Sequence, residues 1–153
     1  MEIYTDGSTR GNGTNNARGG WAFLIKEENL VISGSEINTT NNRMELMAAA
    51  NALERFEQIT EEIILYTDSA YLCNCWKDEW WKSWLKNDWK NSKKQPVANQ
   101  DLWERLIPFF EKPNIKFEKV KGHSGHRENE IVDKFATTAA DQNLIYSENY
   151  VII

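Results

Sequence analysis

The sequence predicts an α/β protein in which helices cover a mixed sheet. Three apolar segments come first, at residues 2–6, 21–26 and 30–37, before any helical pattern begins. Two further apolar runs follow at 62–67 and 115–120, and helical patterns separate them. Three consecutive strands make an antiparallel meander, whereas strands joined through helices pair in parallel. The predicted order is therefore β-β-β-α-β-α-α-β-α.

The first three segments predict a meander at one side of the sheet. Residues 2–6 alternate in polarity and stop at Gly7, which is typical of a strand. Residues 10–20 are rich in Gly and Asn, and we expect them to form a loop. The segments 21–26 and 30–37 are separated by three polar residues and predict a hairpin.

The remaining elements alternate between helix and strand. Asn41 or Asn42 is expected to cap a helix whose apolar stripe repeats at helical spacing. The run at 62–67 is nearly continuous, as expected for a strand buried on both faces. The sequence leaves open whether the tail from about 144 to 153 packs on the core. Helices are predicted at about 69–76, 101–110 and 127–142, with the last strand at 115–120.

Length and composition narrow the class of protein. The 153 residues fit one domain, residues 1–153. No apolar run approaches about 20 residues, so we expect no membrane helix. The N-terminus enters a strand pattern directly, and Cys73 and Cys75 are too few and too close to staple a fold. We therefore expect no secretory leader and a reducing, cytoplasmic setting. A net charge of -5 argues, taken alone, against binding a polyanion.

The charge is unevenly distributed. Residues 76–94 contain six lysines and three acids, and five of the seven tryptophans of the chain. Trp80 and Trp84 share a helix face, with Trp76 one turn earlier. One interpretation places these indoles in the core with the lysines solvated. The other uses indole faces beside ammonium groups to bind a phosphate backbone and stacked bases or sugars. The sequence leaves both open.

Four carboxylates are candidates for one metal site. Asp6 and Asp68 follow the predicted strands 2–6 and 62–67, and the carboxyl ends of adjacent parallel strands meet at one edge. Glu45 and Asp133 each flank the apolar stripe of a helix. Acids that converge repel one another unless a cation neutralises them. Oxygen ligands favour Mg²⁺ or Mn²⁺ over zinc.

Each acid also has a local explanation. Glu45 lies three residues after Asn42 and could close a capping box. Asp68 could cap the next helix, and Asp6 could make a turn with the glycine that follows it. Asp133 could be an ordinary solvent-facing acid. The sequence does not decide between these explanations and a shared site for any one acid.

Five motifs stand in order along residues 2 to about 142: TDGS at 5–8, TTNNRMELMAA at 39–49, YTDSAY at 66–71, PVANQDLW at 96–103 and VKGHSGHRENEIVD at 120–133. Their order and spacing resemble those of type 1 ribonucleases H. The resemblance implies a ribonuclease H-like fold with a five-stranded mixed sheet, three strands antiparallel and two parallel, flanked by helices. It further implies a monomeric endonuclease that cuts the RNA strand of RNA–DNA hybrids, leaves 5′-phosphate and 3′-hydroxyl ends, and uses two Mg²⁺ ions with Mn²⁺ as a substitute.

The resemblance also assigns roles to residues. It implies that His123 assists proton transfer or product release, and that Thr40 and Asn99 grip a phosphate of the DNA strand. Residues 76–95 match the basic segment that follows the DNA strand, which we call the handle. The first loop is longer than is common in bacterial members, and Ala70 replaces a frequent glutamine. The implied metal ligands are Asp6, Glu45, Asp68 and Asp133; the implied minor-groove contacts are Asn12, Asn41 and Asn42; and the implied handle contacts are Trp80, Trp84 and Lys86.

Two other functions compete with this one. A non-catalytic hybrid-binding module on the same fold would be favoured by loss of a metal carboxylate, and none is lost. A zinc-stabilised interaction protein would use Cys73, Cys75, His123 and His126. The two cysteines lie two residues apart in a predicted helix, so their side chains diverge by about 200°. That spacing disfavours zinc.

Overall fold

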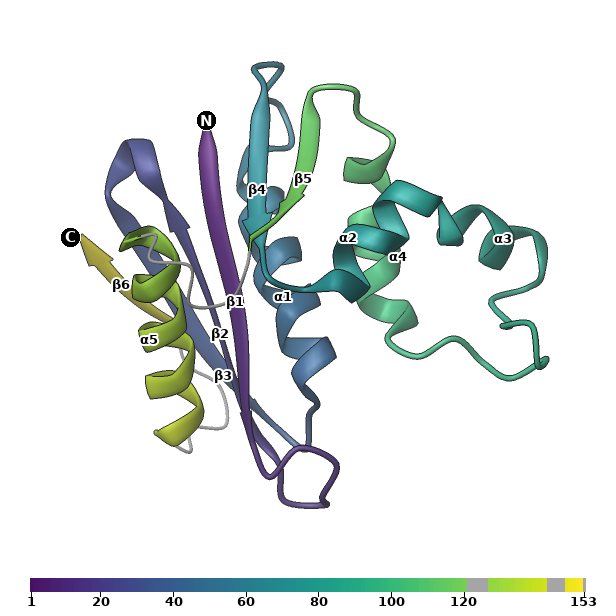
Figure 1. Ribbon diagram of the computed structural model, residues 1–153, viewed down its shortest axis with the longest axis horizontal. Coiled ribbons are helices and arrows are strands. Elements are labelled where there is room, and N and C mark those ends of the chain that lie inside the picture. The colour runs from purple at the N-terminus through teal and green to yellow at the C-terminus, as the bar shows by residue number, and fades with distance from the viewer. Residues whose placement is uncertain (121–126, 143–147, 153) are drawn as a thin grey trace.

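The computed structural model describes residues 1–120, 127–142 and 148–152. Its centre is a six-stranded mixed sheet with strand order β5-β4-β1-β2-β3-β6 (Figure 1). Strands β1, β2 and β3 form the antiparallel meander, and β4 and β5 pair in parallel with β1 and with each other. The predicted five-stranded mixed sheet is confirmed. The strands are β1 Glu2–Arg10, β2 Arg18–Ile25, β3 Leu30–Ile37, β4 Ile63–Thr67, β5 Ile115–Lys119 and β6 Glu148–Ile152.

Helices cover both faces of this sheet. Figure 1 shows α5 on one face and α1 on the other, with α2 and α4 beside α1 and α3 projecting away from the body. One apolar core lies between the sheet and the α1, α2 and α4 layer, and a smaller one lies beneath α5. Within the described part of the chain, no helix has both the length and the apolar character needed to cross a membrane. The helices are α1 Asn41–Leu53, α2 Ala70–Asp78, α3 Trp80–Lys86, α4 Gln100–Phe110 and α5 Arg127–Asp141, with short 3-10 turns at Lys26–Glu28 and Glu54–Phe56.

The first hairpin is longer than the sequence predicts. β1 does not stop at Gly7 but continues to Arg10, and β2 already begins at Arg18. The pair stays in register from Ile3 opposite Ile25 to Arg10 opposite Arg18. The expected loop at 10–20 therefore shrinks to residues 11–17. Polar and glycine residues remain in the ladder here because the backbone pairing does not depend on their side chains.

Two glycines in this hairpin allow helices to approach the sheet closely. A Cβ built on Gly7 would lie 2.5 Å from the backbone nitrogen of Glu45 in α1. A Cβ built on Gly20 would lie 2.0 Å from the carbonyl oxygen of Ala136 in α5. Neither separation tolerates a carbon atom, so these positions require glycine for packing on opposite faces of the sheet.

The helix starts differ from the sequence prediction at α1. Thr40, not Asn41 or Asn42, is the N-cap, because its backbone is extended and its hydroxyl accepts a hydrogen bond from the Arg43 amide at 3.2 Å. The next helix begins at Ala70 with Ser69 as its cap. The expectation that Asp68 caps this helix is therefore wrong.

The C-terminal segment adds a strand that the sequence left open. β6 pairs antiparallel with β3, from Leu30 opposite Ile152 to Gly34 opposite Glu148. The five predicted strands are thus extended by a sixth at the meander side of the sheet.

We predict that Gly20→Ala lowers the free energy of unfolding by about 2–3 kcal/mol, because the new methyl group collides with the α5 backbone. Gly13→Ala is the control: a Cβ there has no atom within 4 Å, although its φ is +86°. We expect the control to cost only about 1 kcal/mol for the left-handed backbone. Denaturant unfolding measures both values, and equal losses would contradict the packing argument.

Candidate functional site

Three carboxylates from separate elements meet at the carboxyl edge of the parallel strands. Asp6 lies in β1, Glu45 in α1, and Asp68 directly after β4. One carboxylate oxygen from each lies within 4.8 Å of the other two. Asp6 and Glu45 are buried, and Asp68 is the most open of the three. The sequence-based expectation that these three acids converge is therefore met by the geometry.

Backbone and hydroxyl donors hold the two buried carboxylates. The Gly7 amide donates to Asp6 Oδ1 at 2.9 Å and to Glu45 Oε1 at 3.1 Å. The Thr67 hydroxyl donates to Glu45 Oε2 at 3.5 Å. Glu45 thus points into the sheet, so the expectation that it closes a capping box at the start of α1 is wrong. The turn explanation for Asp6 also fails, since β1 runs on past it.

The electrostatics of the group are unfavourable when it stands alone. Burial, and then the charge of Asp68, raise the pKa of Asp6 to about 7. Burial, and then the charge of Asp6, raise the pKa of Glu45 well above its ordinary value. Such acids retain protons near neutral pH unless a cation stabilises their charged forms. Hard oxygen ligands at this spacing suit Mg²⁺ or Mn²⁺.

Asp133 lies at the rim of this group. It is an exposed residue of α5, and hydrogen bonding with its side chain is a lesser cause of the raised pKa of Asp6, after burial and the charge of Asp68. It is not one of the three acids whose oxygens all lie within 4.8 Å. Its membership of the metal site therefore stays a prediction. His123 lies outside the described residues.

The asparagines of the first loop and of α1 are connected. The backbone N–H of Asn41 donates to Asn12 Oδ1 at 3.1 Å. The Thr9 hydroxyl donates to the side-chain oxygen Oδ1 of Asn41, also at 3.1 Å. These bonds occupy both side-chain oxygens and leave the side-chain NH₂ groups as donors. Asn42 follows as an exposed residue of the first turn. The long first loop therefore still brings Asn12 to the start of α1.

Thr40 and Asn99 occupy equivalent places on two helices. Thr40 is the N-cap of α1, and Asn99, with φ +63°, is the N-cap of α4. Arg43 near the start of α1 bonds to Asp101 near the start of α4, at 2.9 and 2.7 Å. The structure thus links the beginnings of the two helices that carry these residues.

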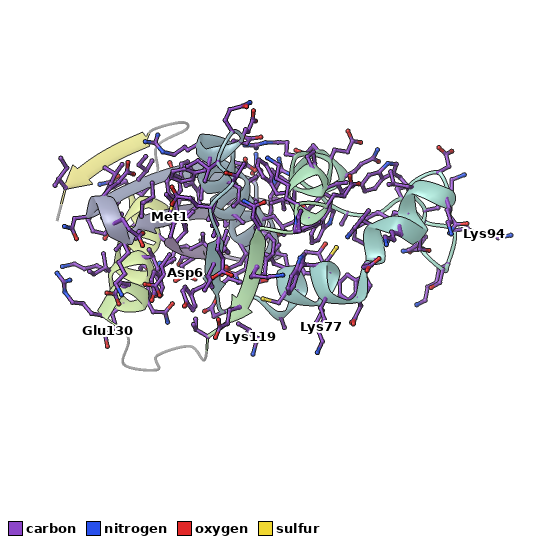
Figure 2. All side chains as sticks on the ribbon, turned by 90° about the horizontal axis from the view of Figure 1, so that it is seen from above. Met1, Asp6, Lys77, Lys94, Lys119 and Glu130 are labelled. Atoms are coloured by element: carbon purple, nitrogen blue, oxygen red, sulfur yellow. The ribbon has the colours of Figure 1, made fainter. Side chains whose placement is uncertain are left out.

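The handle contains both core and surface. Trp81 is buried, whereas Trp76, Trp80, Trp84 and Trp89 are partly buried and pack against the core. Ring contacts continue inward from Trp84 to Trp103, with centroids 5.3 Å apart. The six lysines of residues 76–94 are all exposed, and Figure 2 shows Lys94 at the far end of the handle from Asp6. The indoles therefore belong in large part to the core, and the lysines are solvated; the binding of nucleic acid by this segment stays a prediction.

One open cavity of the handle is lined by both a tryptophan and exposed lysines. It has a volume of about 600 Å³ and is lined by Trp84 with Lys90 and Lys94, together with asparagine and serine side chains. No acid contributes to its lining. An indole beside two ammonium groups suits a phosphate-bearing strand. Lys86 lies nearby on α3 and is exposed.

Sequence reasoning missed the residues that support the site. Gly7 and Thr67 hold the carboxylates, and Arg43 joins two helices. The signal for Gly7 was present, since a glycine directly after an acid in a strand can supply both a free amide and room for a helix. No local pattern indicates the partner of Arg43, because Asp101 is 58 residues away.

The comparisons with known proteins agree with this geometry. A family model described as RNase H matches residues 1–141. The chain belongs to the ribonuclease H family. A ribonuclease H of Syntrophomonas wolfei is 48% identical over 139 residues, covering 90% of this chain and 93% of the relative. A ribonuclease H of Legionella pneumophila is 45% identical over 144 residues, covering 93% and 97%. The resemblance to type 1 ribonucleases H is confirmed, and the protein is a ribonuclease H enzyme.

Solved structures show the same fold. The type 1 ribonuclease H LC9-RNase H1, which carries the type 2 active-site motif, superposes with a TM-score of 0.77 at 26% identity, covering 99% of this chain and 76% of that one. The ribonuclease H domain of a foamy virus superposes with a TM-score of 0.67 at 22% identity, covering 92% and 94%. The second comparison shows the fold alone.

The zinc hypothesis finds no support in the thiols. Cys73 and Cys75 are both free and buried. Burial raises the pKa of Cys73 to about 11 and that of Cys75 to about 12. Among the described residues, neither thiol belongs to a group of three possible metal ligands, and His123 and His126 lie outside the described residues.

We predict that, without divalent metal, the free energy of unfolding falls as pH rises from about 4 to about 7. The reason is that native Asp6 keeps its proton to about pH 7, whereas the unfolded chain releases it near the ordinary pKa of 3.8. Between these two pH values Asp6 ionises in the unfolded chain but not in the folded one. The free energy of the unfolded chain therefore falls relative to that of the folded chain. Asp6→Asn should flatten this dependence and add roughly 1–3 kcal/mol at pH 7.5. Denaturant titrations at several pH values measure it.

Glu57→Gln supplies the control, since Glu57 is an exposed acid outside the site. It should keep the pH dependence of the wild type. A wild-type protein whose stability rises from pH 4 to pH 7 in EDTA would contradict the prediction.

Proposed function

We propose that this ribonuclease H cuts the RNA strand of RNA–DNA hybrids internally with two Mg²⁺ ions, for which Mn²⁺ can substitute, leaving 5′-phosphate and 3′-hydroxyl ends. The observation that carries the proposal is the group formed by Asp6, Glu45 and Asp68, which each place one oxygen within 4.8 Å of the other two. A similarly folded foamy viral protease-reverse transcriptase, 21% identical with a TM-score of 0.69, is described in complex with an RNA/DNA hybrid.

The chain supplies the ligands that such chemistry needs. Asp6 and Asp68 would hold both ions, and Glu45 and Asp133 would complete one site each. When bound, the pair activates the attacking water and stabilises the leaving 3′-oxygen. The raised pKa values of Asp6 and Glu45 fit this role, because the buried carboxylates require a positive charge to ionise fully. We assign proton transfer or product release to His123.

The substrate contacts follow from the placement of donors. Asn12, Asn41 and Asn42 would meet the hybrid in its minor groove, where side-chain NH₂ groups can bond to base edges and 2′-hydroxyls. Thr40 and Asn99 would grip a phosphate of the DNA strand from two helix starts. The handle would continue along that strand through Trp80, Trp84 and Lys86. Contacts of this kind read shape and sugar, so we expect broad sequence specificity.

The organisation of the chain completes the proposal. We infer one catalytic domain over residues 1–153, with the handle at 76–95 and the tail from about 144. We infer a monomer that acts in the cytoplasm, since Cys73 and Cys75 are both free thiols.

A labelled-strand assay tests the activity. Hybrid, RNA duplex and DNA duplex are each labelled on either strand and incubated with Mg²⁺, with Mn²⁺ and with EDTA. We expect cleavage of the RNA strand of the hybrid alone, in the presence of either metal, and no cleavage in EDTA. Cleavage of DNA duplex, or metal-independent cleavage, would refute the proposal.

We predict that Asp68→Asn lowers kcat by at least about a thousandfold while the variant stays folded and binds hybrid, because a ligand to both ions loses its charge. Glu57→Gln removes an acid of similar exposure elsewhere and should keep wild-type kcat. The measurement is steady-state cleavage with circular dichroism of each variant. Wild-type turnover by Asp68→Asn would show the metal assignment to be wrong.

We predict that replacing Lys86 and Lys90 with Ala raises KM and lowers the slope of log K against log salt by about 2, because each lysine near a phosphate displaces about one counterion. Lys116→Ala removes an exposed lysine from β5 and should leave the slope unchanged. Binding titrations at several salt concentrations measure it. An unchanged slope in the double variant would show that these two lysines do not lie near phosphates of the DNA strand.

A further inference from the structure

Two arginine bridges hold α1 and α4 side by side. Near the helix starts, Arg43 donates from both terminal nitrogens to Asp101, at 2.9 and 2.7 Å. Farther along, Arg105 of α4 donates to Asn51 at 2.7 Å and to Glu54 at 2.9 Å. Residue numbers rise along both helices from the first bridge to the second. The helices are therefore parallel, and their N-termini lie at the same end of the pair.

That shared end carries two of the proposed phosphate contacts. Thr40 caps α1 three residues before Arg43, and Asn99 caps α4 two residues before Asp101. A phosphate held by both residues must meet them in a fixed relative position. The Arg43–Asp101 bridge is the described contact between side chains that joins the first turns of the two helices.

The bridge is anchored to the sheet. Arg43 Nε also donates to Glu36 of β3 at 2.8 Å, so three of its five N–H donors are engaged. Its side chain is 24% exposed, whereas that of Asp101 is 63% exposed. A guanidinium forms a planar fork that matches a carboxylate in one geometry, which a lysine cannot reproduce. Arg43 thus holds the start of α4 in a fixed position relative to β3 and α1.

We propose that Arg43 is a positioning residue for the DNA-strand phosphate: through Asp101 it fixes the start of α4 so that Asn99 and Thr40 hold one phosphate together. The inference rests on the proposed function, since the phosphate contact is part of it. We assign Arg43 an indirect role, because three of its five N–H donors already bond to Glu36 and Asp101 and fix its orientation.

The test removes phosphate charges one at a time. Hybrids carry a single neutral methylphosphonate at successive positions of the uncut DNA strand, and kcat/KM is measured for each. In the wild type we expect one linkage at which neutralisation lowers kcat/KM about tenfold, chiefly through KM, as for the loss of a hydrogen bond to a charged group. In the variants Arg43→Gln and Arg43→Lys, the methylphosphonate at that linkage should lower kcat/KM by less than about twofold.

Arg105→Gln is the matched control, since it breaks the other bridge between the same helices. It should lower the melting temperature by a similar amount to Arg43→Gln but keep the wild-type tenfold penalty. If Arg43→Gln also keeps the full penalty, the bridge is merely structural and the inference is overturned. If the wild type shows no sensitive linkage although it cleaves hybrid, the proposed phosphate contact is itself wrong, and the inference fails with it.

Asp101→Asn separates positioning from neutralisation. If Arg43 only cancels nearby negative charge, removing the Asp101 charge strengthens hybrid binding. If Arg43 positions α4, Asp101→Asn breaks the fork and reduces the methylphosphonate penalty as Arg43→Gln does. The second outcome supports the inference and the first overturns it.

Discussion

The close approach of α1 to β1 at Gly7 is the contact on which the site depends. With no side chain at this position, the helix backbone comes near enough for one amide to donate to both Asp6 and Glu45. The same contact places Glu45 in the interior, where a carboxylate is otherwise costly. Fold and site are therefore coupled: a packing requirement between a helix and a strand also sets the spacing of two metal-binding candidates.

Charge placement follows a related logic on a larger scale. The chain is acidic overall, at -5, yet residues 76–94 hold six lysines against three acids. Acids gather at the carboxyl edge of β1 and β4, where divalent cations would neutralise them, and lysines stand exposed along the handle. A net charge says little about affinity for a polyanion when the two signs occupy different surfaces. The net charge bears on the solubility of the molecule, whereas the positions of the charged side chains bear on which partner it can bind.

Much of the fold and of the site could be predicted because local patterns and motif order carried the information. Apolar periodicity placed all five core strands, and Asp6 and Asp68 come together because both lie just past the parallel pairing of β1 with β4. The end of β1 was misplaced because Gly7, normally a punctuating residue, serves here to admit a helix. The N-cap of α1 is Thr40, one residue before the predicted Asn41. The sequence could not decide between them, because threonine and asparagine are both common N-cap residues. Arg43 was missed because its partners lie on other elements.

The sixth strand has a consequence for the edge of the sheet that it covers. β3 would otherwise end the sheet with an open row of backbone donors and acceptors and an apolar Leu30-Val31-Ile32 stretch. An unprotected edge of that kind readily recruits a strand from a neighbouring molecule. β6 follows the other described strands in sequence, so the β3 edge can be covered only after those strands have been made. While β6 is unpaired, this edge is open to a strand from another molecule, and pairing with β6 removes that possibility.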